Sequence, residues 1–163
     1  MKRNFQYKIT EKDVGKTIET FLLEHEYTPS CIKHLKKAPK RITVNGKWEF
    51  VNKVLQEGDL LETCFVEEEG SENIVAVEMP LDIVYEDEDI LVINKGANVP
   101  IHPSKGYEES SLANGVMHYY EKQGKPFVFR SVNRLDQNTT GLVIVAKNMF
   151  SGAILCKSMR KRE

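Results

Sequence analysis

The segment from Val132 to Asn148, VNRLDQNTTGLVIVAKN, constrains the fold more than any other part of the chain. It begins with an Arg and an Asp two positions apart and continues as a polar loop that ends at Gly141. Residues Leu142–Val145 then form an apolar run that is too uniform for the edge of a sheet, so they predict a buried strand. Such an arrangement can place one carboxylate, that of Asp136, in a cleft.

The composition bounds the size of the fold. The chain has 163 residues, 40% of them hydrophobic and 29% charged, which suffices for one ordinary core or two small ones. Its start, MKRNFQYKIT, is polar and no apolar stretch follows it, so we expect no secretory signal, no membrane anchor and a cytoplasmic location. The three cysteines and four histidines show no metal-ligand spacing, which predicts reduced thiols and no metal site.

The net charge of -1 conceals a strong segregation of charge along the chain. Residues 31–53 contain seven Lys or Arg against the single acid Glu49. Residues 54–94 contain thirteen acids and no basic residue, whereas residues 95–163 contain eleven basic residues against five acids. A basic patch of this density suits contacts with phosphates. Basic helix faces are often simply solvated, so charge alone leaves RNA binding and a solvated surface both open.

The first part of the chain predicts two short helices. Apolar residues at helical spacing, starting with Val14, favour an amphipathic helix over Lys16–Glu26. A second helix is expected to begin where Thr28 can cap it and Pro29 can occupy the first helical position. Pro39 ends that helix, because the residue before a proline is disfavoured in the helical region.

A hairpin and a further strand complete this part. Arg41–Val44 and a strand from Trp48 flank the pair Asn45-Gly46, which favours a type I′ turn. Leu60–Val66 is predicted to follow as another strand.

The stretch PSCIKHLKKAPKRITVNGK resembles the alpha-L RNA-binding motif, a small helix-helix-hairpin module that grips structured RNA. The resemblance covers about residues 13–66 and implies RNA contacts from the basic second helix and the turn after it. The candidate residues are Lys33, Lys36, Lys37, Arg41 and Lys47. A lysine on a helix is usually only a solubilising group, so the prediction concerns the patch and no single residue.

An acidic segment, Glu67–Asn73, is expected to link this module to a second domain. The predicted domains are residues 1–70, which include the acidic segment, and residues 71–163. In the second domain Ile83–Tyr85 and Ile90–Ile93 are predicted to pair as strands. A helix capped by Ser110 or Ser111 should then run to about Gly124.

The end of the chain predicts further strands and a helix. Phe127–Val132 is expected to be a strand, as is Leu142–Val145, and Asn148–Arg162 is expected to be a helix. The residues expected to share one face of that helix are Met149, Ala153, Cys156 and Met159. The mixture of elements predicts an α+β fold.

Four stretches of the second domain carry another resemblance: VNRLDQNTTGLVIVAK, VYEDEDILVINK, VPIHP and SLANGVMHYY. They are similar to segments of the uracil-directed RNA pseudouridine synthases that act on large-subunit ribosomal RNA. The resemblance implies a mixed, mainly antiparallel synthase sheet with flanking helices and no cofactor. It implies RNA as the partner, ribosomal RNA first and transfer RNA second. The sequence gives no sign of an obligate protein partner or of membrane contact.

The resemblance also implies roles for individual residues. Converting uridine to pseudouridine breaks the bond from ribose C1′ to N1 and joins C5 to C1′, and an anionic group beside the sugar can act as nucleophile, base or electrostatic stabiliser. That group is Asp136, and nearby Arg134 would favour its charged form and help to turn the target base out of the RNA. Further contacts with the substrate are implied for Asn133, Thr139, Thr140, Gly141 and His102.

Two other interpretations remain open. In a non-catalytic RNA-binding protein the basic residues would supply affinity, and Arg134 and Asp136 would form a surface ion pair worth less than about 1 kcal/mol. Hydrolysis at a sugar would need a second acid beside Asp136, and the spacing of Glu108, Glu109 and Glu121 suggests none.

The chain departs from the family pattern at several places. Asn133 stands where many relatives have His, Thr140 where they often have Ser, and Gly96 where a Pro is common. The family's catalytic domain also runs beyond the Arg-rich helix and there supplies a tyrosine, a basic partner for the aspartate and further strands. We therefore expect an incomplete sheet in the amino-terminal part of a longer synthase, and its activity by itself stays open.

Overall fold

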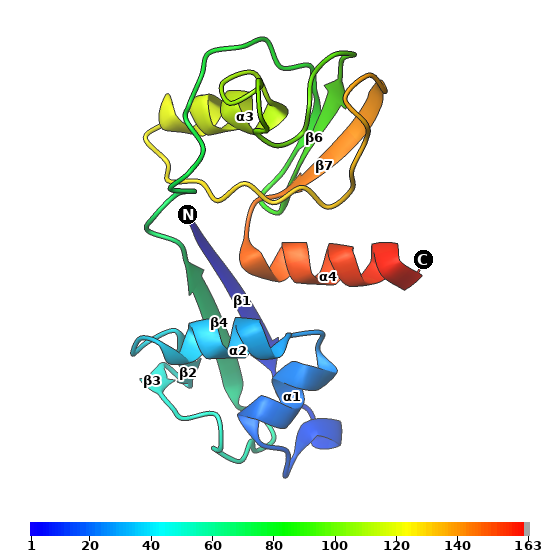
Figure 1. Cartoon of the computed structure of the whole chain (residues 1–163). Coiled ribbons are helices and arrows are strands. Elements are labelled where there is room, and N and C mark those ends of the chain that lie inside the picture. Colours follow the sequence, from blue (N-terminus) through cyan, green and yellow to red (C-terminus); the bar gives the residue numbers. More distant parts are fainter. Residues whose placement is uncertain (162–163) are drawn as a thin grey trace. The chain divides into compact units, whose positions relative to one another are not determined.

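The computed structural model describes residues 1–161 and divides into two compact units (Figure 1). One unit is Lys2–Val66, and the other consists of Met1 and the chain from Glu67 onward. Helices and antiparallel sheets occur together, which confirms the α+β prediction. The division falls between Val66 and Glu67, whereas the sequence predicted a boundary between residues 70 and 71.

The first unit is a four-stranded antiparallel sheet with two short helices. Its elements are β1 (Lys2–Lys8), the 3-10 turn η1 (Glu11–Asp13), α1 (Ile18–Glu24), α2 (Pro29–Lys36), β2 (Ile42–Val44), β3 (Lys47–Trp48) and β4 (Leu60–Val66). The strand order is β1-β4-β2-β3. Its core includes Ile18, Phe21, Leu22, Ile32, Leu35, Ile42, Val44, Leu61 and Phe65.

Hydroxyl caps fix where both helices begin. The Thr17 side chain accepts a hydrogen bond from the Thr20 amide, so α1 starts two residues later than predicted, and Val14 is 49% exposed outside it. The Thr28 side chain accepts from the Cys31 amide, and Pro29 occupies the first turn of α2, as predicted. A cap satisfies an amide that has no acceptor within the helix.

The sequence did not predict β1. This strand pairs with β4 along its whole length, from Lys2 opposite Val66 to Lys8 opposite Leu60. Its alternate residues are only half-buried, and the guanidinium of Arg3 lies over the Phe5 ring at 4.8 Å. A strand that is polar on one side and only half-covered on the other gives too weak an apolar alternation to be recognised.

The hairpin between β2 and β3 has the predicted turn. Asn45 and Gly46 have φ values of 52° and 79°, and type I′ turns need positive φ at both central residues. The register pairs Val44 with Lys47 and Thr43 with Trp48, so Lys47 and Trp48 lie on the edge strand of the sheet.

The second unit is a three-stranded antiparallel sheet with two helices, and its strand order is β5-β6-β7. Its elements are β5 (Ile83–Glu86), β6 (Ile90–Lys95), α3 (Leu112–Glu121), β7 (Gly141–Ala146) and α4 (Met149–Lys161). Helix α3 packs on the sheet through a shared core. That core includes Leu91, Ile93, Val143 and Val145 from the strands and Leu112, Ala113, Val116 and Tyr120 from the helix.

The segment 127–132 is not the strand that the sequence predicted. It forms only an isolated bridge to β7, between Ser131 and Val145. Its earlier part is held elsewhere: the Ser71 amide donates to the Phe127 carbonyl, and the Phe129 amide donates to the Ser71 hydroxyl. These bonds hold Ser71, at which the predicted second domain begins, within the second unit.

The buried face of α4 also differs from the prediction. The helix buries Phe150, Ser151 and Gly152, whereas Met159 is 48% exposed. Asp89 fixes this orientation, because its carboxylate accepts hydrogen bonds from the Ser151 hydroxyl and the Asn148 amide at 2.8 Å each. Arg162, the predicted end of this helix, lies outside the described residues.

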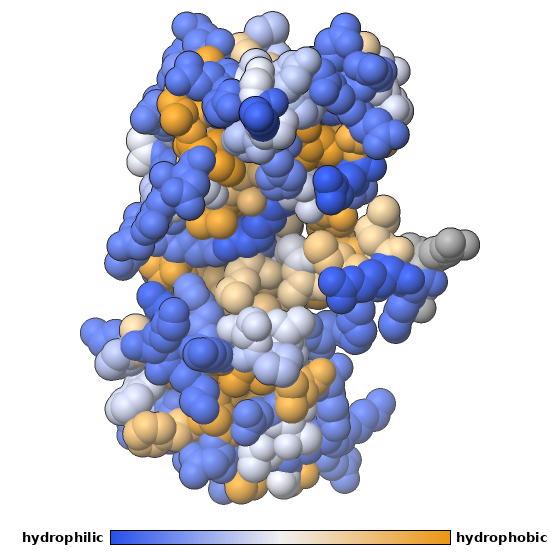
Figure 2. Space-filling model, in the orientation of Figure 1, coloured by the Kyte–Doolittle hydropathy of each residue, from blue (hydrophilic) through white to orange (hydrophobic). Residues whose placement is uncertain are grey.

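Hydrophilic residues cover most of the face that Figure 2 displays, with apolar residues between them. No helix within residues 1–161 has the length and apolar character needed to cross a bilayer.

Gly141 has a φ of 144°, a conformation that residues with a side chain rarely adopt, whereas Gly96 has an ordinary φ and open space around it. We expect Gly141→Ala to lower the free energy of unfolding by about 1–3 kcal/mol. Gly96→Ala, beside the strand partner Lys95, should leave stability unchanged or raise it by up to about 1 kcal/mol. Urea denaturation of both variants checks this, and equal stability of the two would contradict it.

Candidate active site

A pocket of about 390 Å³ lies where two loops of the second unit meet. Residues 100–104 line it from the loop after β6, and residues 134–137 line it from the loop before β7. Arg134 and Asp136 are both exposed in it. Its volume lies within the range of about 300–1,000 Å³ typical of small-molecule sites. The two predicted residues of the Arg-Leu-Asp segment and predicted His102 therefore share one pocket.

The first loop is held by the amino terminus of α3. The amides of Leu112 and Ala113 donate to the carbonyls of Pro100 and Ile101 at 2.8 and 3.0 Å. These amides belong to the first turn, where no acceptor exists within the helix. Ser111 and Asn114 cap the same end reciprocally. The loop that carries His102 is therefore positioned by backbone bonds.

The second loop is held by a buried lysine that the sequence analysis did not single out. Lys95 ends β6 and is 1% exposed. Its Nζ donates to the carbonyls of Gly96, Val99 and Gln137 at 2.9, 2.8 and 3.0 Å. Gln137 follows Asp136 directly, so one ammonium group ties both loops to the end of the sheet.

Lys95 also lies close enough to Asp136 for the carboxylate to act on it electrostatically. Burial lowers the pKa of Lys95 below its usual value, and the negative charge of Asp136 acts in the opposite direction. A buried cation is stabilised by an anion nearby and by acceptors on its protons. The sequence does contain a signal: Leu91, Ile93 and Lys95 alternate on the buried face of β6, so a lysine occupies a core position.

Arg134 acts electrostatically on His102, whereas the sequence predicted an effect on Asp136. Among the ion pairs of residues 1–161, none joins Arg134 to Asp136. The surface ion pair of the non-catalytic interpretation is thus not formed. Arg134 instead lies close enough to His102 to influence it electrostatically. The side chains of Arg134 and Asp136 are therefore both exposed at the surface of the pocket.

His102 lies at the rim with a hydrogen-bond partner. Its Nε2 is 3.1 Å from the Ser131 hydroxyl, and its ring meets the Phe129 ring edge-on at 5.2 Å. Partial burial and the positive charge of Arg134 lower the pKa of His102. The neutral imidazole is therefore the form favoured near pH 7.

The other predicted residues of this loop have several roles. The Thr139 amide donates to the Asp136 carbonyl at 3.0 Å, which closes a turn around the carboxylate. Thr139 and Thr140 are exposed. The Asn133 side chain donates to the Leu142 carbonyl and accepts from the Ile144 amide, so its amide extends the pairing of β7. Asn133 therefore has a structural role, and its contact with substrate stays a prediction.

The basic candidates of the first unit lie mainly at its surface. Lys33, Lys36, Lys37 and Lys47 are exposed. Arg41 differs, because its guanidinium donates to the His34 carbonyl at 3.1 Å in the last turn of α2. A cation there stabilises the carboxyl end of the helix. Arg41 therefore supports the fold of the patch more directly than the lysines do.

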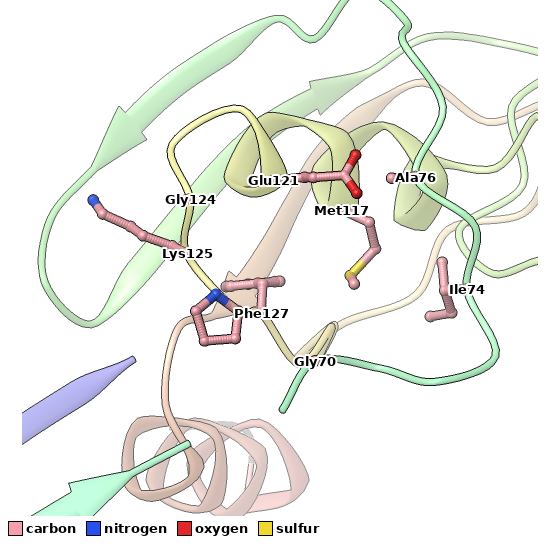
Figure 3. Close-up of a pocket in the computed structure, with 9 residues that line it drawn as sticks. Gly70, Ile74, Ala76, Met117, Glu121, Gly124, Lys125 and Phe127 are labelled. Atoms are coloured by element: carbon pink, nitrogen blue, oxygen red, sulfur yellow. The ribbon is translucent and has the colours of Figure 1, made fainter. Parts of the chain in front are cut away.

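A second pocket, of about 350 Å³, lies beside α3 (Figure 3). Met117 and Glu121 extend toward it from the helix, and Ile74 and Phe127 also line it. It shares no lining residue with the pocket of Asp136. Within residues 1–161, no three His, Cys, Asp or Glu side chains gather in a way that could hold a metal ion.

Comparisons with known proteins identify the family of the chain. Residues 89–163 match the RNA pseudouridylate synthase family. The chain is 37% identical over 144 residues to "Uncharacterized RNA pseudouridine synthase YjbO" of Bacillus subtilis (strain 168), which covers 88% of this chain and 51% of the relative. It is 35% identical over 159 residues to "Ribosomal large subunit pseudouridine synthase D" of Escherichia coli (strain K12), which covers 95% of this chain and 48% of the relative.

A solved structure, "Human RNA Pseudouridylate Synthase Domain Containing 1", is 26% identical with a TM-score of 0.42, over 59% of this chain and 31% of that one. On the family match and the curated relatives, the chain belongs to the RNA pseudouridine synthase family. It spans about half the length of the curated relatives it matches.

Replacing Lys95 with Met should lower the free energy of unfolding by about 2–4 kcal/mol. The substitution leaves three partly buried carbonyls without their charged donor, and a hydrogen bond to a charged group contributes about 1.5–3 kcal/mol. Lys105→Met, at an exposed position of the first loop, is the matched control and should change stability by less than about 0.5 kcal/mol. Urea denaturation measures both; a Lys95→Met variant as stable as its control would refute the anchoring role.

Replacing Arg134 with Gln should raise the pKa of His102, because removal of a nearby cation makes protonation easier. The measurement is an NMR titration of the imidazole protons, with the other three histidines as internal references. Lys122→Gln, at the end of α3, should leave the His102 titration unchanged. An identical His102 titration in wild type and Arg134→Gln would show that the two groups do not interact.

Proposed function

We propose that this chain carries the catalytic carboxylate of an RNA pseudouridine synthase and that Asp136 is that group. The observation that carries the proposal is the exposure of Asp136 in a pocket whose two walls are fixed by Lys95 and by the amino terminus of α3. A reacting carboxylate must be reachable by substrate and held in a defined position. Both conditions hold for Asp136.

The proposed reaction is an isomerisation within one nucleotide. The bond from ribose C1′ to uracil N1 breaks, the base turns, and C5 joins C1′. C5 loses a proton and N1 takes one up, so the composition of the nucleotide is unchanged. Asp136 would act beside the ribose as nucleophile at C1′, as base at C2′ or as stabiliser of a cationic sugar. The ammonium group of Lys95 lies beneath this loop and holds its backbone through the Gln137 carbonyl.

The target uridine must leave its stack before the carboxylate can reach its sugar, at a cost of a few kcal/mol. Arg134 is exposed at the pocket and is not engaged by Asp136, so it is suited to fill the gap in the RNA or to hold the displaced base. Thr139, Thr140 and His102 offer further hydrogen-bonding groups around the same pocket.

The lysines of the first unit would bind RNA through phosphates, as expected of an alpha-L module. The exposed positions of Lys33, Lys36, Lys37 and Lys47 support this. One relative is named for the large ribosomal subunit, and we propose ribosomal RNA as the first substrate to examine and transfer RNA as the second. A cytoplasmic location likewise stays a prediction from the sequence.

Asp136→Asn should lower pseudouridine formation at least about 100-fold, because the amide lacks the charge that the reaction needs. It should leave RNA affinity nearly unchanged. The measurement is pseudouridine content of transcribed ribosomal RNA, together with a filter-binding affinity. The assay uses this chain alone and joined to the carboxyl-terminal half of the Bacillus subtilis relative.

Glu109→Gln is the matched control, since it removes an exposed carboxylate from the same unit outside the pocket lining. It should retain full activity. Equal turnover by the Asp136→Asn variant would eliminate the proposal. Salt-sensitive RNA binding with no pseudouridine from either form would favour the non-catalytic RNA-binding protein.

A further inference from the structure

Two aromatic side chains of the first unit lie outside its core. Trp48 is 48% exposed and Phe50 is 66% exposed, and their ring centroids are 4.7 Å apart with a tilt of 54°. The aromatic residues that support the fold, such as Phe21 and Phe65, are at most 2% exposed. The exposed pair is therefore not explained by packing of the core.

The backbone around this aromatic pair is held on both sides. Trp48 pairs with Thr43 on β2, and the Glu49 amide donates to the Ile42 carbonyl. Beyond Phe50, the Glu19 amide donates to the Val51 carbonyl at 2.9 Å. The two rings thus stand on an ordered edge strand and the turn that follows it, which limits the entropy lost when a ligand binds.

The chain segment that carries the pair is basic, although the sheet register also places Glu62 beyond Thr43 in the row of Trp48. Residues 31–53 carry seven Lys or Arg and one acid, Glu49. That acid is already opposed by Lys53, with 3.4 Å between Nζ and Oε1. Lys47 is exposed and directly precedes Trp48. A phosphate chain that follows these cations would bring its bases within reach of the rings.

We propose that Trp48 and Phe50 form a stacking site for an unpaired nucleobase of bound RNA. Aromatic faces beside cations are the arrangement that binds single-stranded nucleotides, since every base presents a π face. This site would read an unpaired nucleotide next to the structured element that the lysines grip. The inference rests on the proposed RNA-directed function and adds a contact separate from the pocket of Asp136.

A protein partner or a second copy of the chain is the other occupant that an exposed aromatic pair suggests. The charge around the pair favours RNA, because the first unit presents lysines and not an uncharged apolar surface at this edge. The sheet edge itself is short, since β3 contains only Lys47 and Trp48, and it offers little backbone for strand addition.

The test uses the intrinsic fluorescence of Trp48, which is the single tryptophan in the chain. The probes are an RNA hairpin with an unpaired loop and a blunt duplex of the same stem. We expect the hairpin to quench the emission, because a stacked base quenches an indole, and the duplex to quench it much less. Trp48→Leu should weaken hairpin binding by about 5- to 100-fold, and Trp48→Phe should retain most of the affinity.

The dependence of affinity on salt separates stacking from charge. Trp48→Leu should leave the slope of log affinity against log salt unchanged, whereas Lys47→Gln should reduce its magnitude by about 1. A circular-dichroism melt establishes that Trp48→Leu is folded, and Phe50→Leu repeats the test with Trp48 still present as reporter.

Each outcome decides the inference. Hairpin binding with unchanged emission, or with full affinity in Trp48→Leu, would overturn the stacking site and leave the proposed synthase function standing. Emission that varies with protein concentration and not with RNA would identify an interface between copies, and would also overturn it. Failure of wild type to bind either RNA would reject both the stacking site and RNA capture by this unit.

Discussion

The buried ammonium group of Lys95 is the interaction on which the candidate site depends. It ends β6 at a core position and bonds to three carbonyls, one of which follows Asp136 in the chain. Burying a charge is costly unless acceptors and an opposite charge compensate it. The two loops supply the acceptors and Asp136 supplies the charge. The sheet and the loop that carries Asp136 are thereby coupled. The buried ammonium needs the acceptors of the loops, and the loops are held in place by the ammonium.

The sheet register explains where the loop that carries Asp136 ends and β7 begins. Lys95 lies opposite Gly141 at the end of the β6-β7 ladder. Gly141, with its φ of 144°, turns the chain into β7 at a point where a side chain would be strained. The polar residues before it are thus placed above the end of the sheet, over the lysine. The carboxylate is exposed there. The strand that follows it, β7, is an edge strand with Leu142 54% exposed, which corrects the prediction that Leu142–Val145 is a buried strand away from the sheet edge.

Local patterns predicted most of the fold, and the misses have physical causes. Thr28, Pro29, Asn45-Gly46 and Ser111 act through short-range geometry, so their helices and turn could be predicted from neighbouring residues. Strand β1 and the irregular pairing of 127–132 depend on partners far away in sequence.

The candidate site divides in the same way. Arg134, Asp136 and His102 were found from their motifs and share a pocket. No local motif indicates the role of Lys95. That role comes from three carbonyls that only the folded chain brings together. The structural role of Asn133 could not be predicted for the same reason, since its partners on β7 are brought to it only by folding.

The amino terminus of α3 has a consequence for the binding of the proposed RNA substrate near the pocket. The first amides of this helix donate hydrogen bonds to carbonyls of the loop before it and to the Ser111 side chain of the cap. The free amides at the start of a helix can bind an anion, but the first amides of α3 already have acceptors within the protein. The sugar-phosphate chain of a substrate must therefore be neutralised here by flexible cationic side chains, so ionic strength should govern capture at this site as strongly as shape does.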